Sequence, residues 1–299
     1  MSEAPWTALE DRLEAGDAVE VQRLFASWPE ADRTHIASHL SSERLALLLE
    51  MLDSESSAEL IEDLPVSQAA DALEEVDLEA AVGILEELPS DERADLLAEV
   101  EEEDREAILD RVAAETAAEA RTLLEHGPDT AGGLMHTEFL SVREGASVGE
   151  AIEEIRRSAD EYARFAIQYL YAIDDHGRLA GVLPLRELLL ARPGARVGQL
   201  LIRQPIVLEV ADPLDRLYDV FQEHSFLGAP VVDADGVMLG VVERAAVDDA
   251  SIDVAEADHM KSLGIASGEE LRSMPALERS RRRLAWLSIN ICLLYTSDA

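Results

Sequence analysis

A 12-residue repeat of large apolar residues is the feature that most constrains how the first third of this chain can fold. The repeat runs through Trp28, Leu40, Leu52, Leu64, Val76, Leu88, Val100 and Val112. The residue after most of these is Pro, Ser or Asp, which are types that begin helices. Further apolar residues follow eight and nine positions on. The pattern predicts a series of helices of about nine or ten residues, each with one apolar face and a tight turn.

Helices this short are unstable alone, so the repeat predicts an α-helical superhelix in which neighbouring helices stack. The alternative is one long amphipathic helix with fortuitous spacing. Pro65 and Pro89 disfavour it, because they fall where turns are needed. We expect the superhelical domain to span residues 1–127.

Two similar passages follow, and their hydrophobic pattern changes from helical to strand-like. Each reads as a short strand, an amphipathic helix, two strands around a turn, and a second helix. The turns at residues 174–177 and 233–236 both begin with Asp and end with Gly, which supplies a positive φ in a hairpin. The passages predict a duplicated β-α-β-β-α unit, with the copies at residues 128–192 and 193–252.

The charge of the chain limits the class of partner. It holds 63 acidic residues against 25 basic ones, a formal net charge of -38. A nucleic-acid backbone would be repelled, so we exclude a nucleic-acid binder and expect cationic partners, a high-salt cytoplasm, or both. The single cysteine, Cys292, excludes a disulfide framework. No P-loop, nucleophile elbow or catalytic metal triad is present, so we predict that the chain is not an enzyme.

The C-terminal region carries a basic cluster and then an apolar run. Arg279 and residues 281–283 precede a run from Leu284 to Tyr295. Basic residues beside an apolar segment mark the cytoplasmic side of a membrane, but about 20 residues are needed to span it. The run is therefore either an ordinary terminal helix or a membrane helix cut short.

These pieces together resemble the MgtE-type magnesium channel or transporter family. Residues 130–252 resemble a tandem pair of CBS domains, and the motifs PDTAGGLM (128–135) and RRRLAWLSIN (281–290) are similar to that family's. The resemblance implies a superhelical N domain, the CBS pair, a connecting (plug) helix at 253–280, and the truncated start of a first transmembrane helix at 281–299.

The resemblance also implies a function. This portion would be the cytoplasmic Mg²⁺-sensing region of a multi-pass protein of the cell inner membrane, and it would form a homodimer through its CBS domains. Mg²⁺ bound at acidic domain interfaces would compact the dimer and close a pore that lies outside this chain. Mg²⁺ suits such a site, because it prefers oxygen ligands and is usually held by one or two carboxylates and several waters.

Candidate metal ligands follow from the resemblance, which places them in the second CBS domain and at the acidic start of the connecting helix. The matching residues here are Asp215, Asp249, Asp253, Glu256 and Asp258. For any one of them a solvated surface role remains an alternative. The family's acidic pair before the second hairpin is His224-Ser225 here, so that site is weakened or lost.

Nucleotide binding is the competing function. Many CBS domains hold an adenine nucleotide through a hydroxyl residue and an aspartate after the strand glycine. The matching residues here are Pro184 and Glu187 in the first copy and Glu243 and Ala246 in the second. We therefore expect ATP to bind weakly or not at all. A soluble CBS-pair regulator of adenine nucleotides, or a helical scaffold without a ligand, remains the alternative.

Overall fold

The computed structural model describes residue 9, residues 12–159, residue 162 and residues 167–262. For residues 256–262 it describes the helical backbone alone. The predicted transmembrane segment and most of the predicted connecting helix lie outside the described residues. None of the helices in the described part is long and apolar enough to cross a membrane.

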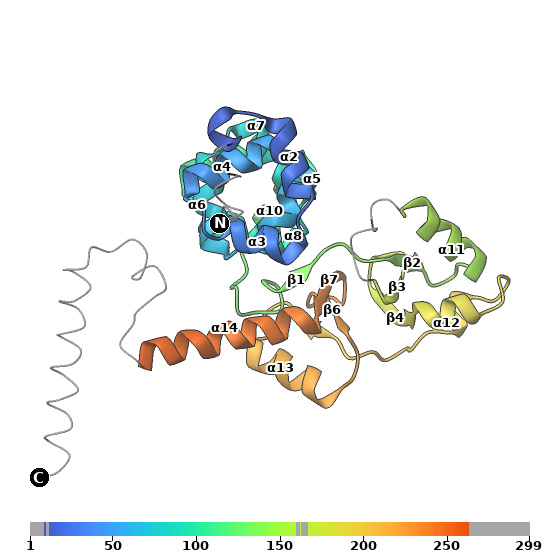
Figure 1. Cartoon of the computed structure of the whole chain (residues 1–299). Coiled ribbons are helices and arrows are strands. Elements are labelled where there is room, and N and C mark those ends of the chain that lie inside the picture. Colours follow the sequence, from blue (N-terminus) through green and yellow to red (C-terminus); the bar gives the residue numbers. More distant parts are fainter. Residues whose placement is uncertain (1–8, 10–11, 160–161, 163–166, 263–299) are drawn as a thin grey trace, which may run out of the picture. The chain divides into compact units, whose positions relative to one another are not determined.

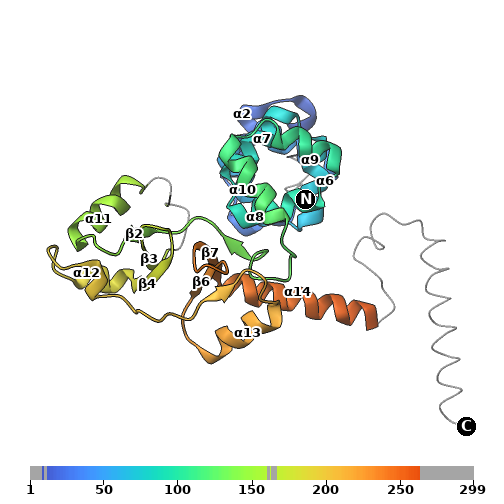
Figure 2. The same cartoon turned by 180° about the vertical axis from the view of Figure 1, so that it is seen from behind.

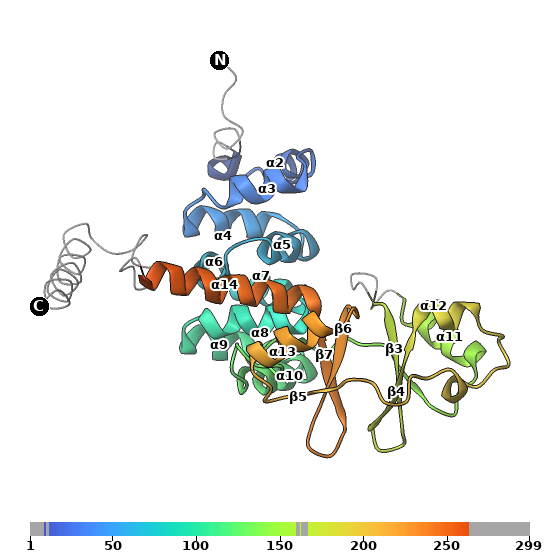
Figure 3. The same cartoon turned by 90° about the horizontal axis from the view of Figure 1, so that it is seen from below.

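The first domain is a superhelix of short helices, as the repeat predicted. The helices are α2 (Ala18–Ala26), α3 (Glu30–Ala37), α4 (Ser42–Met51), α5 (Ser54–Glu62), α6 (Val66–Glu75), α7 (Leu78–Glu87), α8 (Ser90–Glu99), α9 (Glu102–Leu109) and α10 (Ala114–Leu124). From α3 to α10 each helix begins 12 residues after the one before. Viewed end-on, the helices form a ring, and viewed from the side they form stacked layers (Figures 1, 2 and 3).

Helices pack against the helix two places along: α2, α4, α6, α8 and α10 contact in succession, and so do α5, α7 and α9. The repeat anchors from Leu40 to Val112 belong to one continuous buried core or pack against it. Asp53 and Asp77 begin their helices by accepting hydrogen bonds from backbone N–H groups of the first turn. The short helices are therefore stabilised by burial and by caps rather than by length.

A carboxylate of one helix also caps the start of another. Glu50 accepts a hydrogen bond from the backbone N–H of Asp77 at 3.0 Å. In the same way, the backbone N–H of Glu101 donates to the Glu74 carboxylate at 2.8 Å, and that of Ala113 donates to the Glu86 carboxylate at 3.2 Å. Unpaired N–H groups at a helix start favour a negative partner, so part of the acid excess is structural.

The region that resembles a CBS pair, called the CBS region below, follows the predicted β-α-β-β-α order in both copies. The first copy contains β2 (Ser141–Arg143), α11 (Val148–Arg157), β3 (Tyr169–Ile173), β4 (Leu179–Pro184) and α12 (Leu185–Leu190). The second contains β5 (Leu208–Glu209), α13 (Leu214–Glu223), β6 (Gly228–Val232), β7 (Met238–Glu243) and α14 (Arg244–Ser262). The strand orders are β2-β3-β4 and β1-β7-β6-β5, where β1 is the short strand Met135–His136.

The two predicted hairpins are present and pair with each other. Gly177 and Gly236 have φ values of 76° and 80°, as the turns require. The backbone N–H of Leu179 donates to the carbonyl of Gly236, and that of Met238 donates to the carbonyl of Gly177. Tyr171, Val182, Met238 and Val241 are buried in one cluster formed by β3, β4 and β7.

A glycine in the last strand lets the chain approach closely. A Cβ atom on Gly240 would lie 2.6 Å from the carbonyl oxygen of His136 on β1. Any larger residue would push β1 away from β7. The contact positions the residues that follow β1, and two of these, Thr137 and Glu138, form hydrogen bonds with Ser90 at the start of α8.

Helices α13 and α14 pack against each other. The guanidinium of Arg244 at the start of α14 donates hydrogen bonds to the carbonyls of Phe221, His224 and Phe226. It lies 5.2 Å from the centre of the Phe221 ring. The ring of His224 stacks on Phe226.

Candidate functional site

Helix α8 carries a stripe of three acidic residues. Asp91, Asp95 and Glu99 follow one another at four-residue spacing, which places them on one face of a helix. Asp91 and Asp95 are half-buried, whereas Glu99 is exposed. Like charges at this spacing repel, and partial burial increases the effect.

Arg93 fixes this helix in the superhelix. Its side chain is 6% exposed and donates to the carbonyls of Leu85 and Leu88, both at 2.7 Å. A third hydrogen bond, 3.2 Å long, reaches Glu119 on α10. Each guanidinium nitrogen of Arg93 therefore has an acceptor. These bonds tie α8, between Asp91 and Asp95, to α7 and α10.

The start of α8 bonds to the chain that follows β1. Both the backbone N–H and the hydroxyl of Ser90 donate to Glu138, at 3.0 and 2.7 Å. The backbone N–H of Thr137 donates to the Ser90 hydroxyl at 2.8 Å, and the Thr137 hydroxyl donates to Glu119. These bonds join the superhelix to the first strand of the CBS region.

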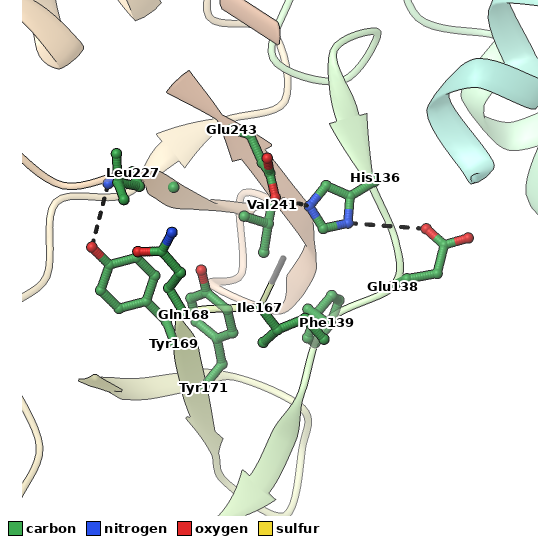
Figure 4. Close-up of a pocket in the computed structure, with 11 residues that line it drawn as sticks. His136, Glu138, Phe139, Ile167, Gln168, Tyr169, Tyr171, Leu227, Val241 and Glu243 are labelled. Carbon is green, nitrogen blue, oxygen red and sulfur yellow. Dashed lines mark hydrogen bonds and ion pairs between the residues drawn. The ribbon is translucent and has the colours of Figure 1, made fainter. Parts of the chain in front are cut away.

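His136 lies between two carboxylates at this junction. Its Nδ1 is 4.0 Å from Glu138 and its Nε2 is 3.7 Å from Glu243 at the end of β7. The ring is buried. Figure 4 shows the imidazole between these two acidic side chains, of which Glu138 follows β1 and Glu243 ends β7.

Burial and charge shift the acidity of the aspartates. Burial raises the pKa of Asp91, His136 opposes that rise, and the negative charge of Glu243 adds to it. Burial also raises the pKa of Asp95 to about 6, with further contributions from the charges of Asp91 and Glu99. Negative charge is therefore unfavourable here, and a cation would relieve the repulsion.

The residues predicted as metal ligands lie elsewhere, on α13 and α14. Asp215, Asp249 and Asp253 are exposed. Asp215 lines a shallow groove between these helices together with Asp248, whereas Asp249 and Asp253 do not line it. For Glu256 and Asp258 the helical backbone alone is described. The described residues contain no group of three or more His, Cys, Asp or Glu placed to hold a metal ion.

The sequence did not single out Asp91 and Asp95. Asp71 and Glu75 on α6 have the same spacing on an equivalent helix, yet both are exposed. What distinguishes α8 is its contact with β1, which no local pattern encodes.

The positions considered for nucleotide binding lie at the ends of β4 and β7. Pro184 ends β4 and precedes α12, and Glu187 is exposed on that helix. Glu243 ends β7, and Ala246 lies on α14.

A pocket opens between the strands beside Glu243. It is partly open to solvent, and Figure 4 shows the side chains that line it. Its aromatic residues are Phe139, Tyr169 and Tyr171, and its acidic residues are Glu138 and Glu243.

Comparisons with known proteins identify both parts of this fold. A family model for the MgtE intracellular N domain matches residues 16–129, and the CBS domain model matches residues 131–194 and 197–252. The magnesium transporter MgtE of Enterococcus faecalis is 36% identical over 282 residues, which are 94% of this chain and 58% of that protein. MgtE of Thermus thermophilus is 36% identical over 143 residues, 48% of this chain and 30% of that protein.

Two solved structures share the fold. The soluble part of a magnesium transporter matches with a TM-score of 0.73 and 25% identity, over 84% of this chain and 98% of that chain. The cytosolic domain of the Mg²⁺ channel MgtE in complex with ATP matches with a TM-score of 0.57 and 29% identity, over 82% and 99%. The chain spans little more than half the length of the E. faecalis transporter. It belongs to the MgtE family and carries that family's intracellular N domain followed by a CBS pair.

Proposed function

We propose that this chain is the Mg²⁺-sensing regulatory region of a magnesium transporter, and that it performs no reaction of its own. In this proposal the chain is cytoplasmic, pairs with a second copy through its CBS domains, and continues into a membrane domain of the inner membrane. When Mg²⁺ binds, the acidic interfaces close together, and the closed arrangement favours a shut pore. The domain boundaries at residues 127/128 and 192/193 are part of the same proposal.

One observation carries the proposal: the half-buried residues Asp91 and Asp95, whose pKa values are raised, lie on helix α8, which contacts β1. A hydrated Mg²⁺ needs only one or two carboxylates, so the lack of a preformed cage among the described residues is compatible with this site. The cation would replace repulsion between α8 and Glu243 with attraction. Asp215, Asp249, Asp253, Glu256 and Asp258 form a second, more exposed set of proposed ligands.

The experiment removes charge from α8 while keeping side-chain shape. We expect millimolar Mg²⁺ to raise the thermal midpoint of the wild-type chain and to reduce its radius in small-angle scattering. At a concentration 100 times the dissociation constant, one site adds about 2.7 kcal/mol. The double variant Asp91→Asn, Asp95→Asn should be more stable than wild type in chelator and should respond less to Mg²⁺.

The matched control is Asp71→Asn, Glu75→Gln, which removes two charges at the same spacing from exposed positions on α6. Its Mg²⁺ response should equal that of the wild type. Monovalent salt at equal ionic strength separates binding from screening. If the α8 variant and the wild type give superimposable Mg²⁺ curves, the sensing carboxylates lie elsewhere.

A second function, response to an adenine nucleotide, has one finding in its favour: a similar cytosolic domain was solved with ATP. Against it stand the Pro184 and Glu187 replacements and a pocket whose described lining contains no Lys or Arg. We expect ATP to bind weakly, and calorimetry showing tight micromolar binding would favour this second function.

A further inference from the structure

The pocket beside Glu243 combines aromatic rings with negative charge. Phe139 lies after β1, and Tyr169 and Tyr171 lie on β3, so the rings come from two separate segments of the chain. Glu138 and Glu243 contribute carboxylates, and no Lys or Arg is among the lining residues that the structure describes. A phosphate group would be repelled here, whereas a positively charged group would be attracted.

The aromatic part of the wall is fixed. The rings of Phe139 and Tyr171 meet edge to face, with centres 5.9 Å apart. Tyr171 is 2% exposed. The hydroxyl of Tyr169 accepts a hydrogen bond from the backbone N–H of Leu227 at 3.3 Å, which holds that ring against the opposite wall. Fixed rings lose little entropy when a ligand binds.

The opposite wall keeps the space open. A Cβ atom on Gly228 would lie 3.2 Å from the Val241 side chain and 3.9 Å from the Tyr171 hydroxyl. A larger residue there would fill space in front of the tyrosine.

The negative charge at the pocket is held in place. Two hydrogen bonds from Ser90 fix Glu138, while Glu243 remains 43% exposed in its side chain. His136 is the one basic side chain among the described lining residues, and it lies 4.0 Å from Glu138 and 3.7 Å from Glu243. The balance of charge around the pocket is negative.

We propose that this pocket binds a small organic cation, such as a quaternary ammonium or a protonated amine. The cationic group would lie against the aromatic faces and near the two carboxylates, and the apolar part would contact Ile167 and Val241. A cation over an aromatic ring is attracted to its π-electrons, most strongly where water is excluded. This proposal does not depend on the Mg²⁺-sensing function.

The test uses the full chain in chelator and measures binding by calorimetry. The probes are choline and its uncharged carbon analogue 3,3-dimethylbutan-1-ol, which has the same shape. Choline should bind at least tenfold more tightly than the analogue. ATP should bind more weakly than choline.

Variants assign the binding to the pocket. Tyr169→Leu keeps an apolar side chain but removes the ring, and it should weaken choline binding at least fivefold. Tyr169→Phe keeps the ring and should retain binding, which also shows that the fold tolerates change at this position. The control Tyr218→Leu removes an exposed tyrosine from α13, outside the pocket, and should bind like the wild type.

Three results would overturn the proposal. Equal affinity for choline and its neutral analogue would show that the pocket recognises apolar shape alone. Tighter binding of ATP than of choline would make it a nucleotide site. No detectable choline binding, or binding unaffected by Tyr169→Leu, would exclude an organic-cation site here.

Discussion

Helices α8 and α14 both carry acidic residues at close spacing, but the structure places them in different environments. On α8, Asp91 and Asp95 are half-buried and their pKa values are raised. On α14, Asp249 and Asp253 are exposed. Both helices carry several acidic residues in the sequence, and the degree of burial distinguishes the aspartates of α8 from those of α14.

This difference in burial indicates which carboxylates a bound cation stabilises most. An exposed carboxylate is already solvated, so neutralising it changes the free energy little. A half-buried carboxylate beside other acids is destabilised in its charged form by lost solvation and by repulsion. We therefore expect α8 to dominate both stability and the response to cations, and the following predictions test that order.

The largest effect is expected from Arg93→Ala. This change leaves the carbonyls of Leu85 and Leu88 without their buried donor and removes the partner of Glu119. Loss of a buried charged partner costs about 3–5 kcal/mol, so we expect a loss of about 3 kcal/mol in urea unfolding.

The control for Arg93 is Arg105→Ala, one repeat later on α9. Arg105 is half-buried, and its guanidinium contacts the carbonyls of Leu97 and Val100 at 3.4 Å each. These longer bonds should contribute about 1 kcal/mol. Equal losses for the two variants would mean that burial does not distinguish α8 from its neighbours.

A smaller effect, with a defined pH dependence, is expected from Asp95→Asn. The pKa of Asp95 is about 6 in the folded chain against an ordinary value of 3.8. Between these values the folded state binds more protons than the unfolded state, so stability falls as pH rises. At pH about 7.5 the variant should be more stable than wild type by about 1–2 kcal/mol, allowing for partial solvent screening, and the difference should vanish near pH 4.

This pH profile should be measured in chelator by thermal unfolding. Asp71→Asn provides the baseline for removing one charge from an exposed site on an equivalent helix. A difference between Asp95→Asn and wild type that does not change from pH 4 to pH 7.5 would contradict the raised pKa. It would also remove the physical distinction between α8 and α14.

How much could be predicted from the sequence differs between the fold and the site. The superhelix was predictable because the 12-residue period recurs from helix to helix. The hairpins were predictable because Gly177 and Gly236 need positive φ values. The importance of Asp91 was not, since it depends on contacts with residues far along the chain, among them Glu243.

The smallest effect is expected from the combined change of Asp249, Asp253, Glu256 and Asp258 to Asn or Gln. Exposed substitutions usually alter stability by less than about 0.5 kcal/mol per site, and Asp249 and Asp253 are exposed. In chelator the thermal midpoint should therefore move little despite the loss of four charges. The Mg²⁺ response should fall by less than in the Asp91→Asn, Asp95→Asn variant, because a bound cation stabilises solvated carboxylates less.

Thermal midpoints and scattering radii, measured in parallel over one Mg²⁺ titration, compare the two variants directly. If the α14 variant loses more of its Mg²⁺ response than the α8 variant, the exposed acids are the principal sensor, and half-burial on α8 is a structural feature of the junction with β1.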